Sequence, residues 1–447
     1  MPLTAGDPSG TLAAVLQSAF ARKRPDRIGV AVSGGGDSVA LLWLMSDWAA
    51  CGGPAVAAVT VDHGLRAEAA DEAAWVGRLA RRLGATHDIL HWRGAAAALS
   101  GGNLPDLARR ARYALIGDWA LSRGIGVVAL AHTLDDQAET VLMRLARGSG
   151  VDGLSAMRIW RRDGPVAYVR PLLQVRRDTL RDYLRAKGAG WCEDPTNDDT
   201  DYRRIRARRA LATLAPLGLT VETLAATADR MALASDALWR VARDLAERAV
   251  SGEAGDLLID EPALLAAGEE TRLRLFAAAL QWVGGDIYRP RFEALRAALE
   301  ALSGRPRTLA GCAFWRDSGP GGPRLRVARE AAAAPPPVPL GSVWDGRWRI
   351  EGPDAPGAPP SAPPGTLTDA PAGAPTGTLT GALGPRGLAL CPGATRRTGL
   401  PRPTLLASPA VWKGGELIAA PLARRDARWR AVLLKDAGAF VAGLEVS

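Results

Sequence analysis

A glycine-rich segment near the start of the chain has the residue types of a phosphate-binding loop. It reads Ser33, Gly34, Gly35, Gly36, Asp37 and Ser38, and it lies between an apolar run and a helix-like run. Consecutive glycines let backbone N–H groups turn toward one anion, and a helix start adds partial positive charge. A carboxylate at Asp37 suits Mg²⁺, which prefers carboxylate and phosphate oxygens together. The alternative is a glycine-rich turn in which Ser38 or Asp37 merely caps a helix.

Two further segments, 62–64 and 132–139, combine histidine with carboxylates. Asp136 and Glu139 stand three residues apart, so they share one face of a helix that begins near Leu134. Acidic residues in a first helical turn also complement the helix dipole, which is a purely structural explanation. Beside a pyrophosphate site, however, such a cluster needs a metal ion or a cationic substrate to compensate its charge.

These polar segments follow expected strands of an α/β domain. Strands are predicted at Ile28–Val32, Ala55–Val61, Thr86–Leu90 and Gly126–Ala131, with amphipathic helices at Glu68–Leu83 and Leu104–Ser122 between them. The alternation predicts a doubly wound, mainly parallel sheet. Ligands of such sheets bind beyond the carboxyl ends of the strands, so the three polar segments should converge there.

Seven motifs occur in a fixed order along the chain. They read SGGGDS (33–38), VDHGLR (61–66), ARRARY (108–113), AHTLDDQAET (131–140), RLARGSG (144–150), RPLL (170–173) and WCEDPTNDDTDYRRIRARR (191–209). This order resembles the tRNA(Ile)-lysidine synthetase family of the N-type ATP pyrophosphatase, or PP-loop, superfamily. The resemblance is strong over residues 25 to 215, moderate over the helical region that follows, and weak over the C-terminal part.

The resemblance implies a tRNA-modifying ligase that uses ATP and Mg²⁺. Its partners would be free L-lysine and a tRNA(Ile) with a CAU anticodon. ATP would adenylate C2 of the wobble cytidine, and lysine would then displace AMP to give lysidine. The modified base pairs with A instead of G, which switches decoding from AUG to AUA.

The resemblance also assigns roles to residues. Ser33, Gly34, Gly35, Gly36, Asp37, Ser38, Asp62 and His63 would bind ATP and pyrophosphate, with Asp37 also placing the metal ion. Asp136 and Glu139 would bind lysine, and one of them could accept a proton. The expected catalytic set is Asp37, Arg109, Arg112, His132, Asp136 and Glu139. The two arginines would neutralise phosphates, although a solvated helix face is the alternative for them.

A basic run near residue 205 is the predicted tRNA contact. It comprises Tyr202, Arg203, Arg204, Arg206, Arg208 and Arg209. Arginines along a helix can follow RNA phosphates, and a tyrosine can stack on a base. The net charge of +9 favours a polyanionic partner. A solvated or internally paired helix is the alternative explanation.

Length and composition suggest several domains in a cytoplasmic protein. We expect a catalytic domain at 1–215, a helical tRNA-binding domain at 216–330 and a small α+β tRNA-contacting region at 331–447. Within that region, residues 353–385 are rich in Pro, Ala, Gly and Thr, and we expect them to be disordered. No signal peptide or membrane-spanning run is evident, so no membrane partner is expected. The chain could form a homodimer.

Two other functions share parts of this pattern. A tRNA cytidine thiolase of the same superfamily usually needs paired cysteines, whereas the four cysteines here are scattered without a C-x-x-C pair. A catalytically silent RNA-binding relative would show damage in the loop or in the acidic helix. Ser33, Asp37, Asp136 and Glu139 are all in place.

Overall fold

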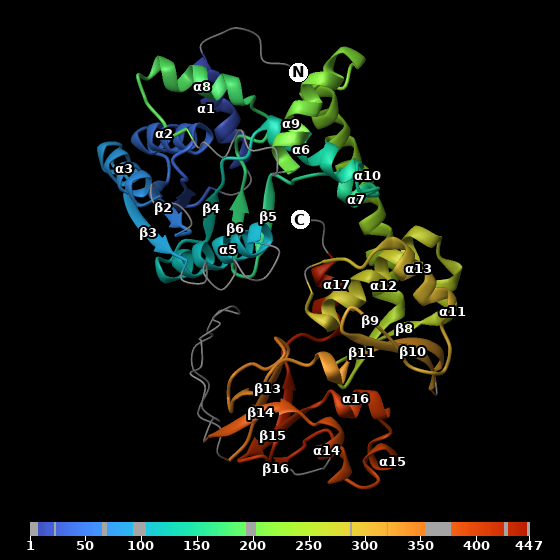
Figure 1. The fold of residues 1–447 in the computed structure, drawn as a ribbon. Helices are drawn as coiled ribbons and strands as arrows, with labels where there is room; N and C mark the ends of the chain where they lie inside the picture. Colours follow the sequence, from blue (N-terminus) through green and yellow to red (C-terminus); the bar gives the residue numbers. More distant parts are fainter. Residues whose placement is uncertain are drawn as a thin grey trace. The chain divides into compact units, whose positions relative to one another are not determined.

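The computed structural model describes residues 8–21, 24–64, 69–92, 104–193, 203–286, 288–319, 321–353, 377–423 and 428–444. Two compact units, Met1–Ser235 and Asp236–Val446, make up the chain. The chain passes from one unit to the other within helix α10 (Val221–Ala249), which Figure 1 shows. The three functional domains expected from the sequence stay a prediction.

The first unit is built on a six-stranded sheet in the order β3-β2-β1-β4-β6-β5. Its strands are β1 (Arg27–Ala31), β2 (Ala55–Asp62), β3 (Thr86–His91), β4 (Val127–Ala129), β5 (Trp160–Asp163) and β6 (Val166–Val169). All neighbours pair in parallel except β5, which is antiparallel to β6 at the edge. The predicted mainly parallel sheet is therefore confirmed. The β5–β6 hairpin was not predicted, because its strands are only four residues long.

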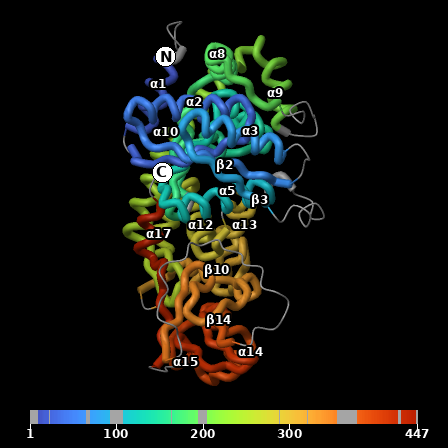
Figure 2. The backbone as a smooth tube through the Cα atoms, turned by 90° about the vertical axis from the view of Figure 1, so that its left-hand side faces the viewer, coloured from blue at the N-terminus to red at the C-terminus, as the bar shows by residue number. Residues whose placement is uncertain are grey.

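Helices cover both faces of this sheet, as Figures 1 and 2 show from two directions. Helices α1 (Pro8–Ala19), α2 (Gly36–Ala50), α3 (Ala69–Arg82) and α8 (Arg177–Ala186) pack on one face, and α5 (Leu104–Ser122) packs on the other. Successive residues of β2 face opposite sides of the sheet. Ala58 packs in the apolar core under α1, α2, α3 and α8, whereas Ala57 and Val59 pack in the core under α5. This period of two is what a strand covered on both faces requires.

Helix α6 (Leu134–Leu145) follows β4 and is packed against the helices that come later in the chain. Ala138 and Val141 of α6 share an apolar cluster with Leu211 of α9 (Arg203–Leu214) and with Leu224 and Ala228 of α10. The short elements α7 (Val151–Leu154) and η2 (Ala215–Leu217) connect this group. No single helix among the described residues is long and apolar enough to cross a membrane. The bent pair Arg204–Leu217 and Val221–Ala249 meets that test only by length and composition.

The second unit contains a five-stranded antiparallel sheet in the order β7-β8-β11-β10-β9. Its strands are β7 (Val250–Glu253), β8 (Asp256–Asp260), β9 (Arg307–Leu309), β10 (Cys312–Gly319) and β11 (Gly322–Arg329), and its helices are α11 (Glu261–Ala266), α12 (Glu269–Gly284), α13 (Phe292–Glu300) and α17 (Ala437–Gly443). Strands β10 and β11 form an antiparallel hairpin. Residues 261–284 form two helices, α11 and α12, because the chain is extended at Ala267 and Gly268 between them.

The C-terminal part adds two smaller sheets, in the orders β12-β14-β15-β16 and β13-β17. Their strands are β12 (Val338–Pro339), β13 (Trp348–Glu351), β14 (Thr378–Ala382), β15 (Pro409–Lys413), β16 (Glu416–Ala419) and β17 (Arg430–Leu433). The short helices are η3 (Ala331–Ala333), α14 (Gly384–Ala389), α15 (Ala394–Thr398) and α16 (Arg402–Leu406).

Part of the tract predicted to be disordered, 353–385, is an ordered strand. Residues 354–376 lie outside the described residues, but β14 occupies Thr378–Ala382 and α14 begins at Gly384. Strand β14 pairs with β12 on one side and β15 on the other, and Thr380 is completely buried. The prediction of disorder is therefore wrong for these residues, because sheet pairing satisfies their backbone groups in a way that composition does not reveal.

Truncation of Leu41 should destabilise the first unit. This α2 side chain is completely buried in the core between the helices and the sheet. We expect Leu41→Ala to lower the free energy of unfolding by about 2 to 5 kcal/mol, since a cavity adds to the lost apolar burial. Urea unfolding of the full chain, followed by tryptophan fluorescence, measures it. Leu145→Ala is the control, because that leucine is 54% exposed; equal losses would contradict the assigned core.

Candidate functional site

The loop between β1 and α2 is folded by its own two serines. The hydroxyl of Ser38 donates to the carbonyl of Gly35 at 2.8 Å and accepts the backbone N–H of Ser33 at 3.1 Å. Gly34 has a φ of +91°, a conformation that favours glycine, and its carbonyl accepts the N–H of Cys192 at 2.9 Å. The glycine at position 34 is therefore a conformational requirement of this loop.

The same loop has the features of an anion site. Helix α2 begins at Gly36 after an N-cap glycine that offers no side-chain hydrogen bond, so the first N–H groups of the helix remain available. A Cβ added at Gly35 would have only Ser33 Oγ within 4 Å, at 3.8 Å. A phosphate can approach this backbone closely, and the helix dipole favours its negative charge. The loop thus fits a polyphosphate.

The acidic start of α6 is held in place by a capping box. The backbone N–H and the hydroxyl of Thr133 donate to Asp136 Oδ2 at 2.9 and 3.0 Å, and the N–H of Asp136 donates back to Thr133 Oγ1 at 3.3 Å. Asp136 is 7% exposed and Glu139 is 1% exposed. Both predicted carboxylates are therefore buried, and the cap fixes the orientation of Asp136.

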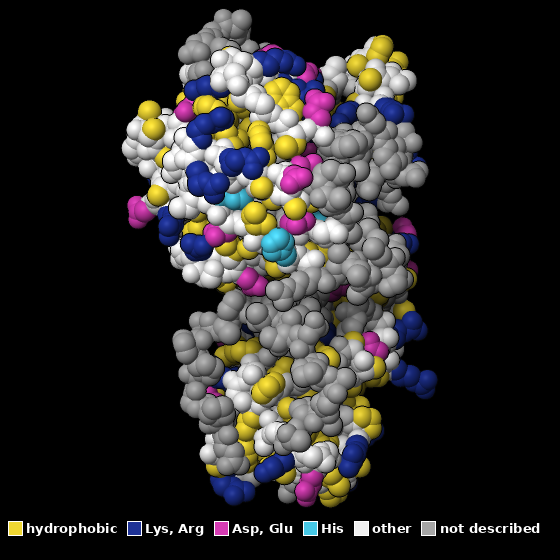
Figure 3. All heavy atoms as spheres, turned by 60° about the vertical axis from the view of Figure 1, so that its left-hand side comes forward, with side chains coloured by type: hydrophobic (Ala, Val, Ile, Leu, Met, Phe, Trp, Pro, Cys, Tyr) yellow, Lys and Arg dark blue, Asp and Glu magenta, His cyan; other side chains and the backbone are white. Residues whose placement is uncertain are grey.

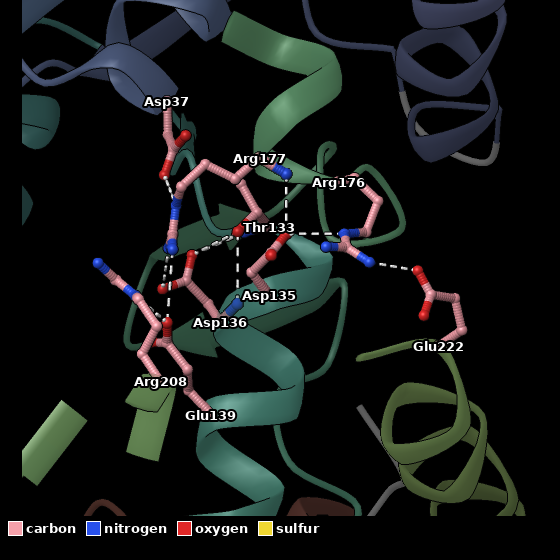
Figure 4. A network of polar contacts seen from close by, with 9 residues as sticks. All are labelled: Asp37, Thr133, Asp135, Asp136, Glu139, Arg176, Arg177, Arg208 and Glu222. Atoms are coloured by element: carbon pink, nitrogen blue, oxygen red, sulfur yellow. Dashed lines mark hydrogen bonds and ion pairs between the residues drawn. The ribbon is translucent and has the colours of Figure 1, made fainter. Parts of the chain in front are cut away.

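One arginine joins the loop to the acidic helix, as Figure 4 shows. Arg177, the first residue of α8, donates from Nε to Asp37 Oδ2 at 2.9 Å. Its Nη2 and Nη1 atoms donate to Asp136 Oδ1 and Glu139 Oε1 at 3.3 and 3.4 Å. Its backbone N–H donates to Asp135 Oδ2 at 2.8 Å. Asp37, Asp136 and Glu139 therefore form one site, although α2 and α6 are far apart in sequence.

Further ion pairs surround this centre. Arg208 of α9 donates from Nε to Glu139 Oε1 at 2.9 Å, while Glu139 Oε2 is buried and has no hydrogen-bond partner among the described residues. Arg176 pairs with Asp135 at 3.4 Å and also with Glu222 of α10. The site thus draws side chains from α2, α6, α8, α9 and α10.

Burial and ion pairing move the pKa values of the site in different directions. Burial raises the pKa of Asp37, and Arg177 only partly offsets this effect. Burial also acts to raise the pKa of Asp136, but Arg177, His132 and the N–H of Thr133 outweigh it, so the pKa is lowered. Burial lowers the pKa of His132 to about 3. At neutral pH, Asp136 is therefore a carboxylate and His132 a neutral imidazole.

The predicted residues after β2 have partners of their own. Asp62 accepts the N–H of Gly64 at 2.8 Å and pairs with His91 at 3.4 Å. Arg112 donates from Nε to His63 Nε2 at 3.3 Å. The guanidinium of Arg109 lies over the ring of Tyr113, 5.1 Å from its centroid. The structure therefore places Arg112 beside His63, and the roles of these residues toward ATP stay predictions.

The predicted tRNA contacts divide between the site and the surface. Tyr202 and the side chain of Arg203 lie outside the described residues. Arg204, Arg206, Arg208 and Arg209 of α9 are exposed. Arg208 pairs with Glu139, and the charge of Arg204 helps to lower the pKa of Asp136, so one face of α9 is turned to the site. On the visible face of the first unit, basic side chains lie interspersed with acidic ones (upper part of Figure 3).

Arg177 was not predicted from the sequence, although it contacts three of the predicted carboxylates, Asp37, Asp136 and Glu139. It stands a few residues after the RPLL motif, in the first turn of a helix. A cation is unfavourable at that end of a helix, where the dipole is positive. An arginine in the first turn of a helix could therefore have indicated that its side chain pairs with acidic residues of another element.

The residue types of the site suit three kinds of ligand: a polyphosphate at the loop, a divalent cation at Asp37 and an organic cation at the acidic start of α6. No group of three or more His, Cys, Asp or Glu side chains in the described part of the chain could hold a metal ion alone. Asp37 beside a phosphate-binding loop nevertheless fits Mg²⁺, which is commonly held by one or two carboxylates together with phosphate oxygens and waters. Asp136 and Glu139 suit an amine.

Comparison with known proteins gives similarity along nearly the whole chain. Residues 8–215 match the model of the PP-loop domain family. The tRNA(Ile)-lysidine synthase of Ruegeria pomeroyi is 45% identical over 435 residues, which cover 96% of this chain and 96% of that protein. A Bradyrhizobium protein of the same name is 45% identical over 298 residues, covering 63% of this chain and 80% of that protein. The similarity to the first relative therefore includes both compact units.

Replacement of Arg177 should cost stability in a pH-dependent way. At pH 7, we expect Arg177→Met to lower the free energy of unfolding by roughly 3 to 5 kcal/mol, because the buried Asp136 loses its guanidinium partner. In the wild type, Asp136 contributes stability above its ordinary pKa of about 4, and this contribution is lost as pH falls through its lowered pKa. In the variant that pKa rises, so Asp136 takes up a proton as the pH falls, and the loss of stability relative to the wild type shrinks from pH 7 to pH 4.

Urea unfolding at several pH values measures the effect. Arg185→Met is the matched control, since Arg185 lies on the same helix but pairs with the exposed Asp182, outside the acidic site. A loss of stability for Arg177→Met that does not change with pH would contradict the ionic role.

Proposed function

The chain belongs to the tRNA(Ile)-lysidine synthase family, and we propose that the pyrophosphate loop and the acidic start of α6 divide its two chemical steps. The enzyme is a ligase that joins lysine to C2 of the wobble cytidine in a tRNA(Ile) with a CAU anticodon. ATP adenylates the cytidine and releases pyrophosphate; the ε-amine of lysine then displaces AMP. One observation carries this division: Asp37, Asp136 and Glu139 meet at a single guanidinium.

The first step is proposed to take place at the start of α2. Ser33 to Ser38 would hold the β and γ phosphates through backbone N–H groups and the two hydroxyls. Asp37 would hold Mg²⁺, which when bound neutralises charge on the leaving pyrophosphate. Burial raises the pKa of Asp37, and a nearby cation would favour its ionised form.

The second step is proposed to take place at the start of α6. The lowered pKa of Asp136 keeps it ionised, which suits an ion pair with the lysine ammonium better than proton acceptance. Glu139 lies one turn away with a free carboxylate oxygen, so it is the better candidate to take the proton as the amine attacks. The neutral imidazole of His132 can donate or accept one hydrogen bond at the activated base.

Arginines around the site are proposed to contact phosphates. Arg109 and Arg112 lie on α5, exposed to solvent, where they could neutralise the α phosphate during adenylation. Arg204, Arg206 and Arg209 of α9 are the arginines proposed to follow the tRNA backbone, since Arg208 is engaged by Glu139. A homodimer and a cytoplasmic location stay proposals, the latter because ATP, lysine and tRNA occur together there.

The thiolase alternative has little to support it. The four cysteines are all free in the structure, and each comes from a different part of the sequence. A catalytically silent RNA-binding relative is also disfavoured, because the glycine loop is intact and Asp37, Asp136 and Glu139 converge on one guanidinium. Both alternatives are set aside in favour of lysidine synthesis.

Incorporation of radiolabelled lysine tests the proposed function. With ATP and Mg²⁺, we expect label in an unmodified tRNA(Ile) with a CAU anticodon and none in initiator methionine tRNA, which carries the same anticodon. The reason is that a ligase of this family must read more than the anticodon. An enzyme that exchanges pyrophosphate into ATP but labels neither tRNA would contradict the assigned nucleophile or RNA.

Removal of the Asp37 carboxylate should stop the first step. We expect Asp37→Ala to slow pyrophosphate release by about a hundredfold or more, because charge stabilisation at the leaving group is lost. tRNA binding should stay close to wild type, as measured by filter binding. Asp182→Ala, which removes an exposed carboxylate of α8, is the control. Normal pyrophosphate release in Asp37→Ala would rule out the metal-placing role.

A further inference from the structure

Arg177 occupies the place where the proposed function puts cationic ligands. Its guanidinium lies between Asp37, assigned to the metal ion, and Asp136 and Glu139, assigned to lysine. Figure 4 shows the side chain reaching from the start of α8 into this group of acids. Arg177 is 15% exposed, so any cation that enters must share these carboxylates with it or displace it.

The guanidinium holds the three acids unequally. Its distance to Asp37 is 2.9 Å, whereas the distances to Asp136 and Glu139 are 3.3 and 3.4 Å. Charge-assisted N–H···O bonds are ordinarily about 2.7 to 2.9 Å long. The bond to Asp37 is therefore a normal one, and the two contacts on the lysine side are loose.

Glu139 retains an acceptor that no donor in the described structure uses. Arg177 and Arg208 both donate to Oε1, and Oε2 is buried without a hydrogen-bond partner. An unsatisfied buried carboxylate oxygen is costly, so a donor is expected there when the site is in use. An ammonium brings three N–H donors, enough for Glu139 and Asp136 together.

The charge balance also leaves room for one more positive charge. Asp37, Asp136 and Glu139 face the two guanidinium groups of Arg177 and Arg208. Asp135 is balanced separately by Arg176. Arg181 and Arg204 add positive charge at longer range to Asp37 and Asp136. Within contact distance, however, three acids face only two guanidinium groups of the described residues, and a single ammonium would be the third cation.

We propose that Arg177 is a specificity-determining residue that stands in for the substrate ammonium in the ligand-free enzyme. When lysine binds, its ammonium takes Asp136 and Glu139, and the guanidinium draws back onto Asp37. This inference rests on the proposed function, because it uses that assignment of lysine to the two acids. An amino acid whose side chain has no positive charge cannot displace the guanidinium from Asp136 and Glu139. Arg177 therefore favours the binding of lysine over that of uncharged amino acids.

A permanent counterion role for Arg177 predicts the opposite result. If the guanidinium only kept the acids ionised, its removal would weaken lysine binding at every pH. If it competes with the substrate, its removal should strengthen binding wherever the acids remain ionised. At pH 8.5 lysine still carries its side-chain charge, because its pKa is about 10.4.

The test is the KM and kcat for lysine in the tRNA-lysidinylation assay at pH 8.5 and pH 6.5. For Arg177→Met at pH 8.5, we expect KM to fall about tenfold, since a competing charge has been removed at close range, with no rise in kcat. At pH 6.5 the gain should shrink, because loss of the guanidinium raises the pKa of the buried Asp136 and favours its neutral form. Arg177→Lys, which retains a competing cation, should keep KM near the wild-type value.

An unchanged or higher KM for Arg177→Met at pH 8.5 would overturn the proposal. Arg177→Gln serves as a second neutral variant if the methionine variant does not fold, which thermal unfolding would show. Arg185→Met controls for loss of positive charge on α8. Failure of the wild type to incorporate lysine would refute the proposed function itself, whereas normal wild-type activity with an unaltered variant KM would refute only the role of Arg177.

Discussion

The ion pairing of Arg177 with three carboxylates is the interaction on which the site depends. Asp136 and Glu139 are almost fully buried, and buried charges of one sign are tolerated only with close counterions. Arg177 and Arg208 supply them from two helices that follow the acids in the chain. The packing of α8 and α9 near α6 is therefore an electrostatic requirement as well as an apolar one.

The parallel sheet explains why the two halves of the chemistry lie side by side. β1 and β4 are neighbours, so the segments that follow them emerge at the same edge. One segment is a glycine loop that leads into α2, and the other carries the capping box that starts α6. Both helices direct their positive ends to this edge, which favours phosphate at the first and stabilises carboxylates at the second.

Several arginines of this chain are counterions of buried acids inside the protein. The net charge of +9 is therefore weaker support for an RNA partner than the sequence suggests. In the second unit, Arg326 is 2% exposed and donates to Asp317 and Asp256 at 2.8 and 2.9 Å, and also to Glu253. Burial raises the pKa of Asp256 to about 6, and a hydroxyl of Thr404 donates to it as well. The number of basic residues in the sequence therefore does not give the number of RNA contacts. Arg208 of α9 is an example, because it pairs with Glu139 inside the protein.

The glycine loop, the acidic pair of α6 and the α/β class could be predicted from the sequence, because these features depend on residue types and periodicities within contiguous segments. The four predicted strands and the helix at Leu104–Ser122 are present for that reason. The tertiary structure alone decided that Arg177 and Arg208 meet the acids and that Thr378–Ala382 is a strand. Ion pairs and sheet pairing join residues far apart in the chain, and no local pattern records which partners the packing will bring together.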